Sequence, residues 1–336
     1  MIITIRSGTS QEATAEIAGN VAGILEQAAV RYRLSQFGGH PVFVTENVPE
    51  KAGNSLKKIS GVESLVDIPE PYPLCSLRIR PEGTVIRIRD FVVGSGNFAI
   101  IAGPCTIETE KQVLKTAQHV KTAGATALRG GAFKPRTSPY SFQGLKLEGL
   151  KILQKVGKET GLVTVTEAMS PEEVKLVAEY ADVIQIGSRN AQNYRLLETC
   201  GEVQTPILLK RGFCNTLEEF LMSAEYILAG GNEQVILCER GIRTFETHIR
   251  YTLPVGTLPA LKSTTHLPVI VDPSHAAGRA DLVASLAFAS TAAGADGLLV
   301  EVHPDPEHAL CDGRQSLTPG EFAAMAKTCE KIRQVI

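Results

Sequence analysis

The chain has 336 residues, of which 43% are hydrophobic and 21% charged, and its formal net charge is −2. This composition is typical of a globular protein with one large domain or two unequal ones. The near-neutral charge excludes a general nucleic-acid or membrane-surface binder, and no apolar run approaches the ~20 residues of a membrane helix. Seven scattered cysteines without a C-x-x-C pair exclude a disulfide framework or a zinc ribbon, so we expect a reducing, cytoplasmic location.

Residues 1–70 predict a small α+β domain with the order β-α-β-β-α-β. The expected strands lie at residues 1–5, 29–34, 41–45 and 62–68, and the expected helices follow Ser10 and cover residues 53–59. This order is ferredoxin-like. A proline-rich run at 69–73 ends the pattern, and residues 71–97 are interpreted as a linker with a β-hairpin at 84–93.

Residues 98–336 alternate between strand and helix. Expected strands cover residues 98–103, 126–130, 162–166, 182–186, 206–210, 234–239, 268–272 and 297–301. Expected helices cover residues 109–123, 146–160, 171–180, 190–200, 215–229, 257–265, 281–293 and 319–333. Eight strands, each followed by a helix, predict a (β/α)8 TIM barrel. The alternative is a doubly wound open sheet, but no Gly-x-Gly-x-x-Gly follows the first strand.

Cationic residues follow several of these strands, at the end where barrels place their chemistry. They are Arg129, Lys134, Arg136, Arg189, Lys210, Arg211, Arg240 and Arg243. So many like charges in one cleft would repel each other unless anions bind there. Guanidinium groups suit phosphates and carboxylates, so the pattern predicts a site for acidic, phosphorylated molecules.

A second set of residues follows strands 1, 7 and 8, which become neighbours when a barrel closes. It consists of Cys105, His275, Glu301 and Asp312. A thiolate, an imidazole and two carboxylates suit a borderline divalent cation such as Zn²⁺, Fe²⁺ or Mn²⁺. His303 competes with Glu301 for this assignment, because alternate residues of a strand face the same side. The residues alone therefore indicate a metal-assisted enzyme that acts on phosphorylated acids.

Several long motifs resemble those of the 3-deoxy-arabino-heptulosonate 7-phosphate (DAHP) synthase family. They are IAGPCT (101–106), LRGGAFKPRTSPYSFQG (128–144), QIGSRN (185–190), LLKRG (208–212), CERGIRTFET (238–247), VDPSHAAGR (271–279) and EVHPDPEHALCDGRQSL (301–317). The resemblance is strong over residues 98–335. It is looser over residues 1–70, which are similar to the N-terminal ferredoxin-like domain of one subclass.

The resemblance implies a transferase that joins phosphoenolpyruvate to erythrose 4-phosphate and releases phosphate, as the first step of the shikimate pathway. It implies a divalent metal, Mn²⁺, Fe²⁺, Zn²⁺ or Co²⁺, held by Cys105, His275, Glu301 and Asp312, and so favours Glu301 over His303. Phosphoenolpyruvate would be bound by Arg129, Arg189, Lys210 and Arg240, with Glu167 and Gln185 near it or near the attacking water. Erythrose 4-phosphate would be bound by Lys134, Arg136, Thr137 and Asp272. Lys134 would transfer a proton to the new alkoxide, with metal-bound water as the alternative donor.

Three residues depart from the expected pattern: Cys311, His248, where the resemblance leads us to expect an aromatic residue, and Thr106, where it leads us to expect serine. Cys311 precedes Asp312, where the family resemblance leads us to expect serine. A second thiol could tune the metal or pair oxidatively with Cys105, and an inert side chain is the alternative.

Three alternatives remain from the sequence. The nearest is 3-deoxy-octulosonate 8-phosphate synthase, which uses arabinose 5-phosphate and carries an Asn-Arg-Ser-Ser-type segment in place of residues 134–138. A non-catalytic paralogue would lack a ligand or a rim arginine, but every such position is filled. The N-terminal domain is either a sensor that binds tyrosine or phenylalanine or a stabilising, oligomerising appendage. We expect a homotetramer or homodimer.

Overall fold

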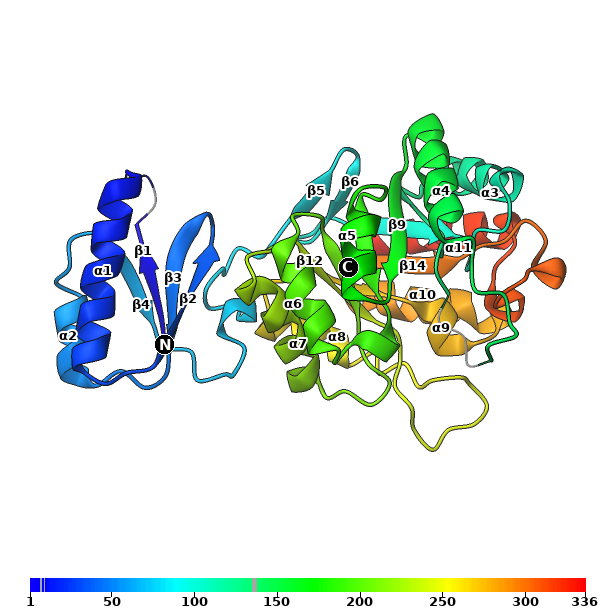
Figure 1. Cartoon of the computed structure of the whole chain (residues 1–336). Coiled ribbons are helices and arrows are strands. Elements are labelled where there is room, and N and C mark those ends of the chain that lie inside the picture. The colour runs from blue at the N-terminus through cyan, green and yellow to red at the C-terminus, as the bar shows by residue number, and fades with distance from the viewer. Residues whose placement is uncertain (7, 9, 135–137) are drawn as a thin grey trace.

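A closed barrel of eight parallel strands forms the larger part of the computed structural model, which describes residues 1–6, 8, 10–134 and 138–336 (Figure 1). The strands are β7 (Ala99–Gly103), β8 (Ala127–Arg129), β9 (Val163–Ala168), β10 (Val183–Ile186), β11 (Ile207–Lys210), β12 (Val235–Glu239), β13 (Val269–Val271) and β14 (Gly297–Glu301). They pair in chain order, and β14 returns to β7 with Gly297 opposite Ala99. The TIM barrel prediction is confirmed.

Helices cover the outside of the barrel between consecutive strands (Figure 1). They are α3 (Glu110–Thr122), α4 (Lys146–Thr160), α5 (Pro171–Ala178), α6 (Tyr194–Glu202), α7 (Leu217–Ala229), α8 (Thr257–Thr264), α10 (Ala280–Ala292) and α11 (Pro319–Arg333). α6 begins later than predicted, because Asn193 caps it by accepting a hydrogen bond from the Leu196 amide, and a 3₁₀ turn, η2 (Ser188–Asn190), precedes it.

Side chains fill the interior of the barrel, and a hairpin closes one of its ends. The hairpin strands β5 (Ile86–Ile88) and β6 (Phe91–Val93) turn at the predicted Arg89-Asp90. Ile86, Phe91 and Val93 are buried among the strand residues of the inner core. Because this end is sealed, the polar residues at the carboxyl ends of the strands form the accessible mouth.

The N-terminal segment forms an antiparallel sheet of order β2-β3-β1-β4, which is the ferredoxin-like order. Its elements are β1 (Ile2–Ile5), α1 (Gln11–Gln27), β2 (Tyr32–Phe37), β3 (His40–Thr45), α2 (Glu50–Leu56) and β4 (Val62–Val66). Both helices pack on one apolar cluster with the strands.

Two predicted N-terminal elements are displaced along the chain. The strand expected at 29–34 begins at Tyr32, because Ala29 adopts a left-handed φ of 52° and ends α1. The amides of Ala29 and Val30 donate to Glu26 and Leu25, so a Schellman motif forms with alanine in place of glycine. The helix expected at 53–59 spans Glu50–Leu56 instead, directly after Pro49.

The N-terminal segment lies beside the barrel and contacts it at α7 and the linker (Figure 1). The Ser35 hydroxyl donates to the carbonyl of Ala229, and the Gly38 amide donates to Glu233. Leu74 and Cys75 of the linker turn η1 (Pro73–Cys75) are buried, and His266 and Glu225 bond to the backbone of Leu74.

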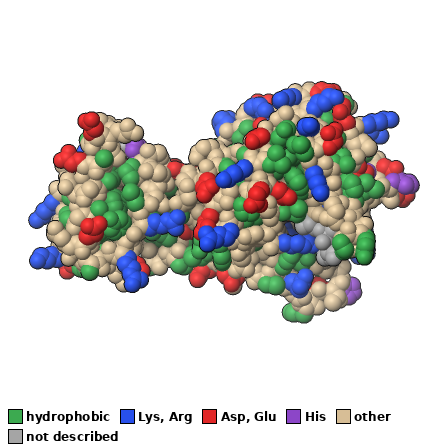
Figure 2. Space-filling model, viewed as in Figure 1, with side chains coloured by type: hydrophobic (Ala, Val, Ile, Leu, Met, Phe, Trp, Pro, Cys, Tyr) green, Lys and Arg blue, Asp and Glu red, His purple; other side chains and the backbone are tan. Residues whose placement is uncertain are grey.

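The surface mixes both signs of charge. Figure 2 shows lysines and arginines interspersed with aspartates and glutamates on the visible face. Across the described residues, no helix combines the length and apolar character that crossing a membrane would need.

Candidate active site

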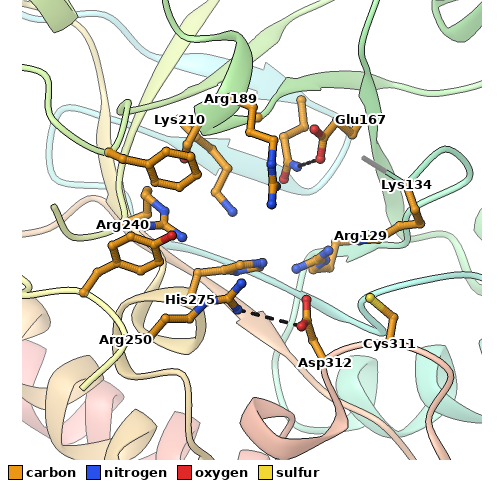
Figure 3. A pocket seen from close by; sticks show the side chains of 15 residues that line it. Arg129, Lys134, Glu167, Arg189, Lys210, Arg240, Arg250, His275, Cys311 and Asp312 are labelled. Carbon is orange, nitrogen blue, oxygen red and sulfur yellow. Dashed lines mark hydrogen bonds and ion pairs between the residues drawn. The ribbon is translucent and has the colours of Figure 1, made fainter. Parts of the chain in front are cut away.

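A pocket of about 210 Å³ opens at the carboxyl ends of the barrel strands. Figure 3 shows the side chains of its lining converging on a common space. The lining comprises Arg129, Lys134, Glu167, Gln185, Gly187, Ser188, Arg189, Lys210, Phe213, Arg240, Arg250, Tyr251, His275, Cys311 and Asp312. Six of these are lysine or arginine, so the cationic mouth predicted from the sequence is present.

Two of the pocket cations are balanced by buried carboxylates. Arg129 donates to Glu301 at 2.8 Å, and the Lys210 ammonium bonds to Asp272. Both carboxylates are fully buried. Burial raises the pKa of Asp272, but His275 and Lys210 outweigh that effect and hold it well below its usual range.

Arg189 and Arg240 are different, because neither lies within ion-pair distance of a carboxylate among the described residues. Arg240 is only 3% exposed, burial lowers its pKa, and its buried Nε has no hydrogen-bond partner in the described part of the chain. Arg189 is exposed, whereas Arg240 presents a buried guanidinium group without a carboxylate partner, and such a group is a strong binding group for an anionic ligand.

Two aromatic rings hold these arginines in place. Phe213 and Tyr251 stack with their ring centroids 5.3 Å apart and an interplanar angle of 9°. The Arg240 guanidinium lies 3.9 Å from the Tyr251 centroid and 5.0 Å from that of Phe213. Arg189 lies 5.8 Å from the Phe213 centroid. Such contacts orient a guanidinium without neutralising its charge.

Lys134 lies at the opposite side of the pocket from Arg240, beside Cys105, which follows β7 (Figure 3). Its Nζ donates to the carbonyl of Cys105 at 3.2 Å and to the Cys105 Sγ at 3.1 Å. Burial lowers the pKa of Lys134, but the neighbouring Cys105 and Cys311 outweigh burial and raise it. The amine is therefore protonated and able to donate.

Glu167 and Gln185 form one unit on neighbouring strands. The Gln185 amide donates to Glu167 at 3.0 Å, and both side chains line the pocket. Gly187 makes room for this carboxylate, since a Cβ at this position would lie 2.2 Å from a Glu167 oxygen.

Candidate metal ligands gather at the floor of the pocket in two overlapping groups. In the described part of the chain, one group is Cys105, Cys311 and Asp312, and the other is His275, Glu301 and Asp312; within each, the ligand atoms lie within 4.8 Å of one another. Sulfur, imidazole nitrogen and carboxylate oxygen together fit a borderline divalent cation.

Local structure explains how these ligands are presented. Asp272 caps α9 (Pro273–Ala277) by accepting a hydrogen bond from the backbone amide of His275. The His275 ring lies 2.7 Å from Asp272 and 3.4 Å from Glu301. Asp312 has a left-handed φ of 51°, which aspartate tolerates better than most residues.

Glu301 and His303, which competed for one ligand position in the sequence, have clearly different surroundings in the structure. Glu301 is fully buried and receives hydrogen bonds from Arg129 and from Gln315. His303 lies 3.5 Å from Glu108 instead and belongs to neither candidate metal group.

Most residues singled out from the sequence meet at this pocket, with some exceptions. Cys105, Asp272 and Glu301 lie buried against its lining residues. Arg136 and Thr137 lie outside the described residues. Arg211 was expected at the cationic mouth, but it is buried against Glu239 and the carbonyl of Asn215, and it does not line the pocket. Arg243 does not line the pocket either.

Phe213, Arg250 and Tyr251 are among the lining residues that the sequence did not identify. Arg250 donates to Gln315, which in turn donates to Glu301, so it is linked to the candidate metal floor. Arg250 lies in the long segment between β12 and α8 and does not directly follow a strand, so the rule that selected the other site residues does not apply to it. The adjacent Arg250 and Tyr251 could have indicated this site from the sequence, since arginine and an aromatic residue often bind anions together.

The fold is that of a TIM barrel enzyme, and its pocket combines a cationic lining with two candidate metal-ligand groups among the described residues. Residues 78–336 match the model of the DAHP synthetase I family, and the chain belongs to that family.

Comparison with known proteins agrees with this assignment. The chain is 50% identical over 283 residues to phospho-2-dehydro-3-deoxyheptonate aldolase of Thermotoga maritima, covering 84% of each chain. It is similar to the crystal structure of Thermotoga maritima DAHP synthase with a TM-score of 0.79, at 44% identity, over 99% of this chain and 97% of that one. A 2-dehydro-3-deoxyphosphooctonate aldolase of Geobacter sulfurreducens is 32% identical over 72% of this chain and 95% of its own length.

Proposed function

We propose that this chain is a DAHP synthase that condenses phosphoenolpyruvate with erythrose 4-phosphate and water, giving DAHP and phosphate. The observation that carries the proposal is the pairing of an anion-binding mouth, centred on Arg189 and Arg240, with a metal-ligand floor in the same pocket. The family assignment and the relative of 50% identity support it.

Phosphoenolpyruvate carries a phosphate and a carboxylate, and the pocket offers a cation for each. Arg189 and Arg240 have no carboxylate partner within the described residues, so an anionic group of the substrate neutralises them on binding. Arg129 and Lys210 are already paired with the buried carboxylates of Glu301 and Asp272. They therefore attract the substrate anion less strongly and serve to orient it.

Bond formation joins C3 of phosphoenolpyruvate to the aldehyde carbon of erythrose 4-phosphate. Cys105, His275, Glu301 and Asp312 would hold a divalent cation, which would supply Lewis acidity toward the aldehyde oxygen. Lys134 is protonated and lies at the edge of this floor, and it transfers a proton to the new alkoxide.

Water then adds to C2 of the former phosphoenolpyruvate, where positive charge develops. The Glu167–Gln185 pair lines the pocket and provides a carboxylate that accepts the proton of this water. The resulting hemiketal phosphate releases phosphate, and Asp272 lies beside the hydroxyl groups of the sugar. Arg136 and Thr137 hold the aldose phosphate.

We propose that residues 1–70 form a regulatory domain that binds tyrosine or phenylalanine, residues 71–97 a linker, and residues 98–336 the catalytic domain. The ferredoxin-like topology and the likeness to a full-length relative support this division. We also propose a cytoplasmic homo-oligomer, a tetramer or a dimer.

The test is a reaction of the purified chain with both substrates, with DAHP identified by mass spectrometry and phosphate release measured in parallel. We expect equal amounts of the two products, loss of turnover after chelation, and recovery when Mn²⁺, Fe²⁺, Co²⁺ or Zn²⁺ is added back singly. Turnover that is untouched by a chelator which removes all bound metal would refute the metal-dependent mechanism.

A further inference from the structure

Cys311 lies in the floor of the pocket, where the sequence pattern of the family leads us to expect serine. Its side chain is 5% exposed and lines the pocket next to Asp312. Figure 3 shows its sulfur directed to the same side as the Asp312 carboxylate. The loop after β14 thus carries two adjacent donor groups into one space.

The two sulfur atoms are as close as two ligands of one ion. The Sγ atoms of Cys105 and Cys311 are 3.3 Å apart, and the Cys105 Sγ lies 3.3 Å from an Asp312 oxygen. Two thiolates bound tetrahedrally at ~2.3 Å from zinc are about 3.8 Å apart. A change of roughly 0.5 Å therefore brings both sulfurs to bonding distance of one ion.

The site offers two alternative ligand groups that differ in chemical softness. Cys105, Cys311 and Asp312 form one, and His275, Glu301 and Asp312 form the other. Asp312 belongs to both. Soft thiolates favour Zn²⁺ and Cd²⁺, whereas nitrogen and oxygen donors suffice for Mn²⁺.

We propose that Cys311 is a fifth metal ligand of this chain, and that it gives thiophilic cations a two-sulfur site with Cys105 and Asp312. Mn²⁺ binds toward His275, Glu301 and Asp312 and does not need the second sulfur. The inference rests on the metal-binding part of the proposed function and deepens it, because a residue of this chain sets the metal preference.

The test compares the full-length wild-type chain with C311S and C311A, and uses C214S as the matched control. Cys214 is an exposed thiol outside the candidate metal groups of the described residues. All proteins are stripped of metal and kept reduced, and circular dichroism confirms that each is folded. Zn²⁺ and Mn²⁺ affinities are measured by chelator competition, and X-ray absorption counts the sulfur atoms around bound Zn²⁺.

We expect two sulfur ligands on Zn²⁺ in the wild type and in C214S, and one in C311S and C311A. Zn²⁺ affinity should fall by about 10- to 100-fold in both Cys311 variants, while Mn²⁺ affinity changes by less than ~3-fold. The first range is that observed when a residue that interacts with a metal ligand is mutated. One sulfur on Zn²⁺ in the wild type, or equal losses for both metals, would overturn the proposal. A two-sulfur zinc site in a protein that forms no DAHP would instead contradict the proposed function alone.

Discussion

Phe213 provides a demanding test of how the pocket binds phosphoenolpyruvate, because its side chain bears no charge and acts only by packing against the arginines. It faces Arg240 at 5.0 Å and Arg189 at 5.8 Å, and it stacks on Tyr251. The change to test is Phe213→Leu, which keeps an apolar side chain but removes the ring. The guanidinium groups of Arg189 and Arg240 then lose the aromatic ring of Phe213, which orients them before the substrate binds.

The size of the effect follows from the cost of ordering these side chains on binding. Immobilising a flexible side chain costs ~0.5–1.5 kcal/mol, and two arginines are affected, so binding should weaken by about 1–3 kcal/mol. This corresponds to a roughly 5- to 150-fold increase in the dissociation constant of phosphoenolpyruvate. We expect kcat to change much less, because the ring contacts of Phe213 within the described residues are with Tyr251 and arginines and not with Lys134 or the candidate metal ligands.

The assay is titration calorimetry with phosphoenolpyruvate, together with initial rates at saturating erythrose 4-phosphate. Phe245→Leu is the matched control, because the same ring is 99% exposed there and does not line the pocket. A dissociation constant for Phe213→Leu within twofold of the control would refute the idea that the aromatic rings pre-organise the arginines.

Three further predictions concern other parts of the molecule. Lys134→Ala should lower kcat by at least ~100-fold and change phosphoenolpyruvate affinity by far less, and an unchanged kcat would exclude the proton-transfer role. His266 donates to Leu74 and accepts from Thr84 as a neutral ring, and burial lowers its pKa from 6.5 to about 4. Its contribution to stability is therefore present above pH 6.5 and is lost as the pH falls from 6.5 to 4, by up to about 3 kcal/mol. The free energies of unfolding of wild type and His266→Asn, measured with denaturant, should therefore differ less at pH 4 than at pH 7. A difference that stays constant with pH would contradict the assignment of a neutral, buried His266. Removal of residues 1–69, which spares the turn η1, should abolish inhibition by tyrosine or phenylalanine; equal sensitivity of the full and shortened chains would contradict a regulatory N-terminal domain.

The architecture was predictable because the barrel strands are buried on both faces. Runs such as Val269–Val271 and Gly297–Glu301 are continuously buried, and helices separate them at regular intervals. The strand predicted at 29–34 was misplaced for a local reason. Its apolar residues Ala28 to Val30 terminate α1 through backbone hydrogen bonds that no hydrophobic pattern reveals.

The candidate site was predictable where a residue directly follows a strand, because the barrel brings strand ends together. Arg211 shows the limit of this reasoning. It follows β11 immediately, yet it forms an ion pair with Glu239 on the neighbouring strand. A sequence does not show which cations are paired with carboxylates inside the protein. Arg250 and Tyr251 were missed because a long segment returns them to the pocket, and that path depends on tertiary packing.

The most direct measurement of the central claim is the choice of aldehyde substrate. Phosphate release from phosphoenolpyruvate is measured with the metal-loaded, full-length chain and either erythrose 4-phosphate or arabinose 5-phosphate, and kcat/KM is compared. We predict rapid release with erythrose 4-phosphate, with DAHP as the product, and little or none with arabinose 5-phosphate. A higher kcat/KM with arabinose 5-phosphate would contradict the account and identify the chain as an octulosonate phosphate synthase.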